Sequence, residues 1–132
     1  MPYTYKPEGH PVVSPYLVVE EIEPLIAFLE EVFGGEEMVR HEDEAGGVLH
    51  AEVRIEESVI MMGEAGSGWS PTPSMLHIYV EDVDGTYERA LEAGGTKVQE
   101  PMRQEGESDR RCGVKDPAGN TWWIATRVEV SD

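Results

Sequence analysis

The sequence predicts an α+β fold built from two tandem βαβββ modules, and an internal repeat is the main reason. Residues 19–23 (Val-Glu-Glu-Ile-Glu) align with residues 80–84 (Val-Glu-Asp-Val-Asp) at one fixed offset. After each match, helical periodicity runs to a Gly-Gly pair, Gly34-Gly35 in the first half and Gly94-Gly95 in the second. Three strand-like segments then follow in both halves. A repeat that preserves the order of its elements predicts a fold more firmly than any single element does.

The first module is expected over residues 11–63. Residues 12–19 are rich in β-branched and aromatic side chains, which is typical of a strand. A helix should follow, with acids and Pro24 in its first turn and Gly34-Gly35 after its last turn. Its apolar positions form one stripe at helical spacing: Ile22, Leu25, Ile26, Leu29, Val32 and Phe33. The remaining strands are predicted at 37–42, 48–55 and 58–62.

The second module is expected over residues 74–128, after a connecting loop at 63–74 that is rich in glycine, serine and proline. Its elements are predicted as a strand at 75–80, a helix at 82–93, and strands at 96–99, 110–115 and 121–127. Asp116-Pro117-Ala118-Gly119-Asn120 has the residues of a hairpin turn between the last two strands. Residues 1–10 are polar, and we interpret them as a lead-in to a single domain spanning 11–128.

Composition limits the classes of function. The 27 acids and 10 bases give a formal net charge of −17, which should repel nucleic acid. We interpret most of this charge as a solvated acidic surface. No apolar run approaches the roughly 20 residues of a membrane helix, and the N-terminus does not have the pattern of a signal peptide. The single cysteine, Cys112, is compatible with a reducing compartment, so a cytoplasmic protein is expected.

Several motifs along the chain resemble the vicinal oxygen chelate superfamily, in its glyoxalase/bleomycin-resistance/dioxygenase branch. They occur in the family's order over residues 11–127: 15–19 (Pro-Tyr-Leu-Val-Val), Phe28 to Gly34, 50–52 (His-Ala-Glu), 80–84, 109–110 (Asp-Arg) and 116–122 (Asp-Pro-Ala-Gly-Asn-Thr-Trp). The resemblance implies paired βαβββ modules, each with a curved four-stranded sheet that half-encloses a cleft. It also implies pairing of modules within one chain or across a homodimer, and we expect the homodimer.

In the metal-using members of that family, four ligands come from equivalent strand positions, two in each module. The matching positions here carry Ser14, Met61, Met75 and Trp123. Thioethers and an indole do not suit the hard metals of these enzymes. The absence of metal-binding side chains at these four positions therefore argues against the metal-dependent catalysis that is usual in the family. No cofactor is expected.

The same substitutions should give the cavity an adaptable apolar and aromatic lining. Our leading hypothesis is a binding protein that sequesters a small aromatic or apolar molecule, as bleomycin-resistance proteins do with drugs. The ligand would stack on Trp123 and contact Met61, Met75, Tyr16 and His77. The alternative for these side chains is that they only fill the core.

The remaining polar candidates each have two interpretations. His77 shares the predicted cavity face with Met75 and could contact a ligand, or it could be a satisfied buried histidine. Trp69, in the central loop, could be a lid, an interface anchor or a local packing residue. Arg110, beside Asp109, could contact an anionic ligand, although we favour a structural ion pair. Cys112 has no activating base nearby in the sequence, so a nucleophilic role is not expected.

The sequence leaves two rival functions open. One is a metal-dependent lyase, isomerase or dioxygenase whose site has moved to His50, Glu52 and His77. The other is a dimeric interaction module with no ligand. The sequence favours a binding protein over an enzyme, and it does not name the ligand.

Overall fold

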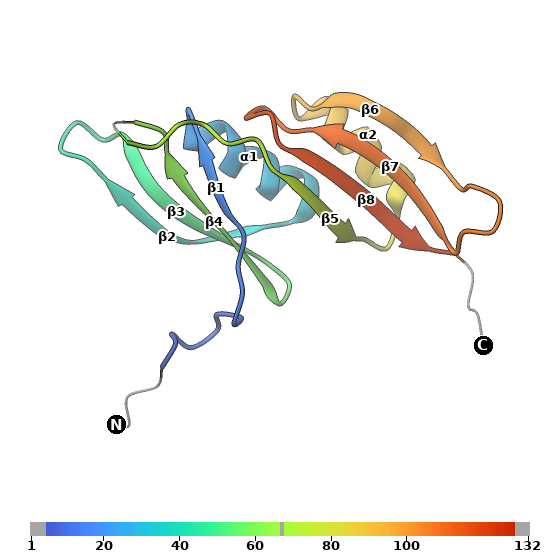
Figure 1. The fold of residues 1–132 in the computed structure, drawn as a ribbon, viewed down its shortest axis with the longest axis horizontal. Helices are drawn as coiled ribbons and strands as arrows, with labels where there is room; N and C mark the ends of the chain where they lie inside the picture. The colour runs from blue at the N-terminus through green and yellow to red at the C-terminus, as the bar shows by residue number, and fades with distance from the viewer. Residues whose placement is uncertain (1–4, 67, 129–132) are drawn as a thin grey trace.

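The structure, a computed structural model, describes residues 5–66 and 68–128 and has the two βαβββ modules that the repeat predicts (Figure 1). Module 1 consists of β1 (Tyr16–Val19), α1 (Ile22–Phe33), β2 (Glu36–Glu42), β3 (Val48–Ile55) and β4 (Ser58–Glu64). Module 2 consists of β5 (Met75–Tyr79), α2 (Val83–Glu92), β6 (Thr96–Met102), β7 (Asp109–Lys115) and β8 (Thr121–Arg127). The predicted fold class is confirmed. Residues 1–4 of the predicted lead-in and residue 67 of the predicted loop lie outside the described residues.

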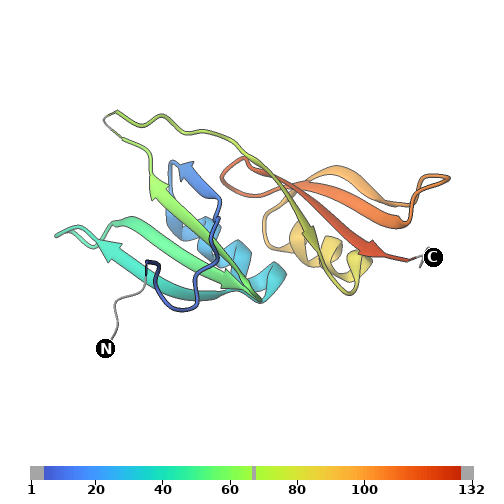
Figure 2. The same cartoon turned by 60° about the horizontal axis from the view of Figure 1, so that its bottom comes forward.

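The two sheets have the same topology. Their strand orders are β1-β4-β3-β2 and β5-β8-β7-β6, and in each sheet the first strand pairs in parallel with the last. The other pairings are antiparallel. Figures 1 and 2 show the sheets side by side along the long axis, each with its own helix packed against it. The helices α1 and α2 also contact each other, which joins the modules.

Three strand boundaries differ from the prediction by more than one residue. The first strand begins at Tyr16 rather than at residue 12, because β1 has a partner only from the pair Tyr16 and Met61 onward. The last strand of module 1 extends to Glu64, where it still pairs with Val19. In module 2, β6 continues to Met102 through Pro101, which is tolerated because β6 is an edge strand and needs no N–H on its open side.

The helix ends and the last hairpin follow the predicted signals. Gly34 ends α1 at a φ of 69°, and the N–H groups of Gly34 and Gly35 bond to carbonyls of the last turn. The turn after β7 is built around Asp116, and Gly119 adopts a φ of 92°. The Asp116 carboxylate accepts bonds from the backbone N–H groups of Ala118 and Asn120, at 2.9 and 3.0 Å.

The core lies between the helices and the sheet faces that they cover. Alternate strand residues supply the sheet side, while the α1 stripe supplies the other. Trp122 is the largest fully buried side chain, and its indole N–H donates to Asp116 at 2.8 Å. No helix in the described part of the chain is long and apolar enough to cross a membrane.

Candidate functional site

In module 2, the sheet face turned away from α2 gathers several of the predicted ligand residues. Trp122 and Ile124 of β8 are buried toward the helix, so Trp123 between them projects from the opposite face. Register places Trp123 opposite His77 of β5 and opposite Gly113 of β7. We call this surface the module 2 face, and it consists of Met75, His77, Tyr79, Gln99, Asp109, Arg111, Gly113 and Trp123.

The indole of Trp123 lies directly over Gly113. A Cβ atom placed on Gly113 would come within 2.7 Å of Cζ3 of the ring, which is closer than real contacts allow. Glycine at this position therefore lets the ring lie against the sheet. The side chain of Trp123 remains partly exposed. Beside it is a hollow of about 150 Å³, lined by Gln99, Met102, Gln104, Glu107, Asp109, Arg111 and Trp123.

A polar network borders this ring. The Tyr79 hydroxyl donates to Asp109 at 2.8 Å, and the Arg111 guanidinium donates to the same carboxylate oxygen at 3.0 Å. The Nε of Arg111 also donates to Nε2 of His77 at 3.3 Å. Partial desolvation of the ring and the charge of Arg111 lower the pKa of His77, although the residue as a whole is exposed. His77 is therefore neutral near pH 7, accepts through Nε2 and carries its proton on Nδ1.

Module 1 has an equivalent outward face, which we call the module 1 face. Register places Met61 of β4 between Tyr16 of β1 and Glu52 of β3. The Tyr16 hydroxyl lies 3.2 Å from Nδ1 of His50, and Nε2 of His50 lies 2.9 Å from Oε2 of Glu52. The other carboxylate oxygen of Glu52 is 2.7 Å from Nε2 of His10. The face thus carries a chain of hydrogen bonds from Tyr16 to His10.

The structure brings only part of the predicted site together. Met75, His77 and Trp123 share the module 2 face, whereas Tyr16 and Met61 lie on the separate sheet of module 1. A single cavity between the two groups was expected. Neither of the two larger described cavities is lined by Met61, Met75 or Trp123.

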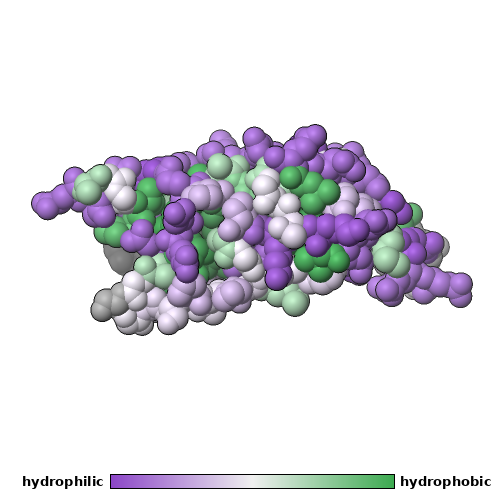
Figure 3. Space-filling view, turned by 90° about the horizontal axis from the view of Figure 1, so that it is seen from above, coloured by the Kyte–Doolittle hydropathy of each residue, from purple (hydrophilic) through white to green (hydrophobic). Residues whose placement is uncertain are grey.

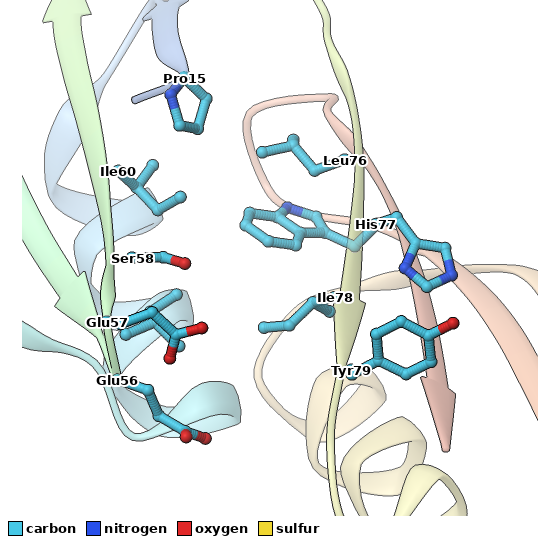
Figure 4. Close-up of a pocket in the computed structure, with 11 residues that line it drawn as sticks. Pro15, Glu56, Glu57, Ser58, Ile60, Leu76, His77, Ile78 and Tyr79 are labelled. Atoms are coloured by element: carbon cyan, nitrogen blue, oxygen red, sulfur yellow. The ribbon is translucent and has the colours of Figure 1, made fainter. Parts of the chain in front are cut away.

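The larger of these cavities, about 440 Å³, lies between the modules (Figure 4). Ile60 from β4 and Leu76 and Ile78 from β5 point into it from opposite sides, while the side chains of His77 and Tyr79 point away. Glu56 and Glu57 stand at its rim. Of the predicted ligand residues, His77 alone borders this cavity, and its side chain points away; the other walls are mostly residues next to the core.

Arg110 and its neighbour Arg111 lie on opposite sides of β7. The Arg110 guanidinium forms a two-pronged ion pair with Asp84 of α2, at 2.8 and 2.9 Å, so it lies on the helix side of the sheet. Arg110 is thus in an ion pair, but with Asp84 rather than with Asp109. Arg111, which was not among the predicted site residues, is the arginine beside Trp123. The alternation along β7, with Cys112 in the core, was the signal that could have found it.

Trp69 is exposed and Cys112 is buried, which bears on the roles considered for each. The side chain of Trp69 is 66% exposed, while its backbone forms an isolated bridge with Gly66. Local packing therefore does not account for the ring, and its roles as lid or anchor stay predictions. Cys112 is fully buried, and burial raises the pKa of its thiol to about 11. The thiol remains protonated near neutral pH, as expected for a residue with no nucleophilic role.

The residues do not fit a metal of the kind that the resemblance implies. Met61, Met75 and Trp123 occupy three of the four ligand positions and offer no hard donor. The relocated set is also divided, since His50 and Glu52 lie on the module 1 face and His77 on the module 2 face. Within residues 5–66 and 68–128, no group of three or more His, Cys, Asp or Glu side chains could hold a metal ion.

The exposed surface reflects the acidic composition. Seen from above, most of the molecule is hydrophilic, and hydrophobic patches interrupt it (Figure 3). Several large apolar side chains are exposed on the strands at the inner edges of the sheets, including Tyr16, Met75 at 72% and Tyr79 at 60%.

Comparison with known proteins agrees with this architecture. A model of the Glyoxalase/Bleomycin resistance protein/Dioxygenase superfamily matches residues 9–124. An uncharacterized protein of Mycobacterium bovis is 32% identical over 129 residues, a match that covers 89% of this chain and 84% of that protein. An uncharacterized protein of Mycobacterium tuberculosis has the same identity, with 75% of its length covered.

Solved structures at lower identity share the fold. TioX from Micromonospora sp. ML1 is 23% identical with a TM-score of 0.73, and the match covers 89% of this chain and 98% of that one. A glyoxalase-related enzyme from Fulvimarina pelagi is 21% identical, with a TM-score of 0.72 and coverage of 88% and 87%. The fosfomycin resistance protein FosX from Listeria monocytogenes is 17% identical, with a TM-score of 0.68 and coverage of 88% and 92%. These likenesses concern the fold alone.

Proposed function

Since this chain belongs to the glyoxalase/bleomycin resistance protein/dioxygenase superfamily, we propose that it binds a small, flat apolar or aromatic molecule without using a metal. One observation carries the proposal. The Trp123 indole lies against Gly113 and remains partly exposed, with Met75 and His77 on the same face. A flat ring held in this way offers a stacking surface that loses little conformational freedom on binding.

The polar groups around the ring would orient such a ligand. Arg111 is held by Asp109 and His77, and a neutral His77 that accepts through Nε2 would offer its Nδ1–H to a ligand. Gln99 adds an amide to the adjoining hollow. Binding pockets of this kind are mostly apolar with a few placed polar groups that set orientation. The hollow of about 150 Å³ would take one edge of the ligand, while the rest lies on Trp123.

We further propose that the complete cleft forms in a homodimer, where the module 1 face of one copy meets the module 2 face of the other. Within one chain these faces belong to separate sheets. The edge strands β1 and β5 also expose Tyr16, Met75 and Tyr79. Such edges are normally covered, because an open strand edge invites pairing. Light scattering during size-exclusion chromatography tests this, and a monomer at all concentrations contradicts it.

Tryptophan fluorescence tests the binding site itself. The chain has three tryptophans, of which Trp122 is buried and Trp69 lies in the loop. Planar dyes such as ethidium and 8-anilinonaphthalene-1-sulfonate should quench the emission of the Trp69→Phe variant as they quench the wild type. The Trp123→Phe variant should lose most of the quenching. Equal quenching in all three chains, or none, contradicts the proposal.

The two rivals predict different measurements. An enzyme with a relocated metal site requires a stoichiometric divalent metal in the purified protein, with an activity that a chelator removes. That result would overturn metal-independent binding. An interaction module without a ligand predicts no quenching by any planar compound, together with a stable dimer. The binding protein is favoured over the metal enzyme because three of the family's ligand positions hold side chains that are poor ligands for hard metals: Met61, Met75 and Trp123.

A further inference from the structure

The phenol of Tyr16 reaches across its own sheet on the module 1 face. Tyr16 is half-exposed on β1, and register places it opposite Met61 of β4. Gly63, two residues further along β4, leaves room for the ring, because a Cβ there would lie 2.5 Å from the Tyr16 hydroxyl oxygen and 3.0 Å from Cε1. His50 of β3 is the antiparallel partner of Gly63. The hydroxyl therefore crosses Gly63 and comes within 3.2 Å of Nδ1 of His50.

The direction of each hydrogen bond in this chain follows from the charge of Glu52. Desolvation opposes ionisation of this carboxyl, but hydrogen bonds from His50 and His10 outweigh it and hold its pKa below the ordinary value. The ionised carboxylate can only accept, so Nε2 of His50 carries a hydrogen and donates to it at 2.9 Å. The other nitrogen of a neutral imidazole, Nδ1, is then an acceptor. The Tyr16 hydroxyl therefore donates to His50.

The groups behind the phenol are held on several sides. The His50 and Glu52 side chains are only 22% and 12% exposed. The second oxygen of Glu52 lies 2.7 Å from Nε2 of His10, which fixes the carboxylate. The imidazole of His50 lies beside the Tyr16 ring and beside the His41 ring, with centroid separations of 5.7 and 5.5 Å. The more exposed end of the chain is thus the Tyr16 hydroxyl, and the groups that orient it are the more buried ones.

A hydroxyl, an imidazole and a carboxylate joined in this order form the arrangement that activates oxygen nucleophiles in acyl transfer. The imidazole takes the hydroxyl proton as the oxygen attacks, and the carboxylate stabilises the imidazolium that forms. The two separations, 3.2 Å from Tyr16 to His50 and 2.9 Å from His50 to Glu52, lie within hydrogen-bond reach. The geometry is therefore that of a phenol with a general base in place.

Tyr79 of module 2 provides a contrast within the same chain. It is more exposed than Tyr16, at 60% against 50%. Its hydroxyl donates to the Asp109 carboxylate at 2.8 Å, and this bond raises the pKa of the phenol. A carboxylate accepts a proton far less readily than an imidazole near pH 7. Exposure alone would make Tyr79 the more reactive phenol, whereas the hydrogen-bond partners favour Tyr16.

We propose that Tyr16 is a nucleophile for acyl transfer from activated esters, with His50 as its general base and Glu52 as the positioning carboxylate. The Tyr16 oxygen bonds to the carbonyl carbon of the ester, and the bond from that carbon to the leaving oxygen breaks. The phenolic proton passes to Nδ1 of His50 and then to the leaving oxygen. The products are an acyl ester of Tyr16 and the free alcohol or phenol. This activity goes beyond ligand binding and does not use the Trp123 surface.

Acetylation by p-nitrophenyl acetate tests the proposal in the unaltered chain. Peptide mass spectrometry after brief exposure to the ester measures how fast each tyrosine gains an acetyl group. Tyr16 should react about a hundredfold faster than Tyr5 or Tyr79, the order of magnitude that a general base contributes. Both comparison residues are more exposed than Tyr16, Tyr5 at 83% and Tyr79 at 60%. Acetylation of Tyr16 no faster than that of these two overturns the proposal.

Variants then test the roles of the two groups behind the phenol. His50→Gln should slow acetylation of Tyr16 roughly a hundredfold. Glu52→Gln should slow it less, because the base remains, and should leave Tyr5 acetylation unchanged, which a general loss of structure would not do. His41→Gln is the matched control, since this histidine lies beside the His50 ring but outside the chain of hydrogen bonds.

Two outcomes contradict the assigned roles. One is an unchanged Tyr16 rate in His50→Gln, and the other is an equal decrease in His41→Gln. If His50→Gln does not fold, the comparison of Tyr16 with Tyr5 and Tyr79 in the wild-type chain still decides the proposal. Because the ester replaces the planar dyes, a failure of acyl transfer is distinguishable from a failure of the proposed binding function.

Discussion

Trp123 and Gly113 are opposite each other on neighbouring strands, and the glycine has no side chain because the indole occupies that space. A methyl group at Gly113 would lie 2.7 Å from Cζ3 of the ring and 3.0 to 3.1 Å from two further ring atoms, so the ring would have to move. The position of the ring, and hence of the stacking surface, is therefore set by a residue that need not touch the ligand.

Replacing Gly113 with alanine should lift the Trp123 ring off the sheet and lower the affinity for planar dyes. The overpacking should also lower the free energy of unfolding by about 1–3 kcal/mol. Gly66→Ala is the matched control, since nothing lies within 4 Å of a Cβ there. Fluorescence titration and urea unfolding check both effects. Equal dye affinity in the two variants means that the ring does not form the binding surface.

Replacing Arg110 and replacing its neighbour Arg111 should have different effects on the affinity for planar dyes. Arg111→Met removes the guanidinium from the Trp123 face and should weaken the binding of the anionic dye 8-anilinonaphthalene-1-sulfonate more than that of ethidium. Arg110→Met removes the exposed pair with Asp84 on the other side of β7 and should leave both affinities unchanged. Titrations of the two variants in parallel decide this. A larger loss for Arg110→Met would place the site on the helix side of the sheet.

Stability should depend on pH through His77. Its pKa is lowered in the folded protein by partial desolvation of the ring and by Arg111, whereas the unfolded chain has the ordinary value of 6.5. The unfolded state therefore binds more protons below this pH, so the stability contributed by neutral His77 is complete above pH 6.5 and decreases as the pH falls below it. Urea unfolding between pH 5.5 and 7.5 should show a shallower pH dependence for His77→Gln than for the wild type. Identical slopes contradict this assignment.

The buried Asp116 carboxylate should contribute far more to the free energy of unfolding than an exposed carboxylate in a similar turn. Asp116 accepts from the Ala118 and Asn120 backbones and from the Trp122 indole, and it is only 4% exposed. Asp116→Asn should cost about 2–3 kcal/mol of unfolding free energy, because buried donors lose a charged acceptor. Asp43 also accepts two backbone bonds, but it is exposed, so Asp43→Asn is the matched control and should cost less. Equal losses would show that burial of the carboxylate is not the cause.

The sequence predicts the fold well because its signals are local and repeated. The Gly-Gly helix ends, the strand alternation at 48–55 and the Asp116–Asn120 turn all depend on neighbouring residues, and the structure has each of them. The start of β1 was placed too early because a strand also needs a partner, and β-branched Val12 and Val13 have none.

The site was harder to predict because it depends on contacts between distant segments. Strand parity placed Met75 and His77 on one face, because they alternate along one strand, whereas Trp123 was added through the ligand position that the resemblance implies. It does not say which sheet faces meet, so Met61 and Tyr16 were placed in one cavity with residues of the other module. The contact between His10 and Glu52 joins a polar lead-in to a strand and has no local signal.

The most direct test of the binding proposal is a map of ligand-induced shifts in ¹H–¹⁵N NMR spectra, with ethidium and 8-anilinonaphthalene-1-sulfonate as probes. Binding on the module 2 face should concentrate the shifts at the Trp123 indole N–H and the backbone amides of His77, Arg111 and Gly113, and Trp123→Ala should abolish them. Shifts concentrated instead at Ile60, Leu76 and Ile78, in the cleft between the modules, or no shifts with either probe, would contradict it.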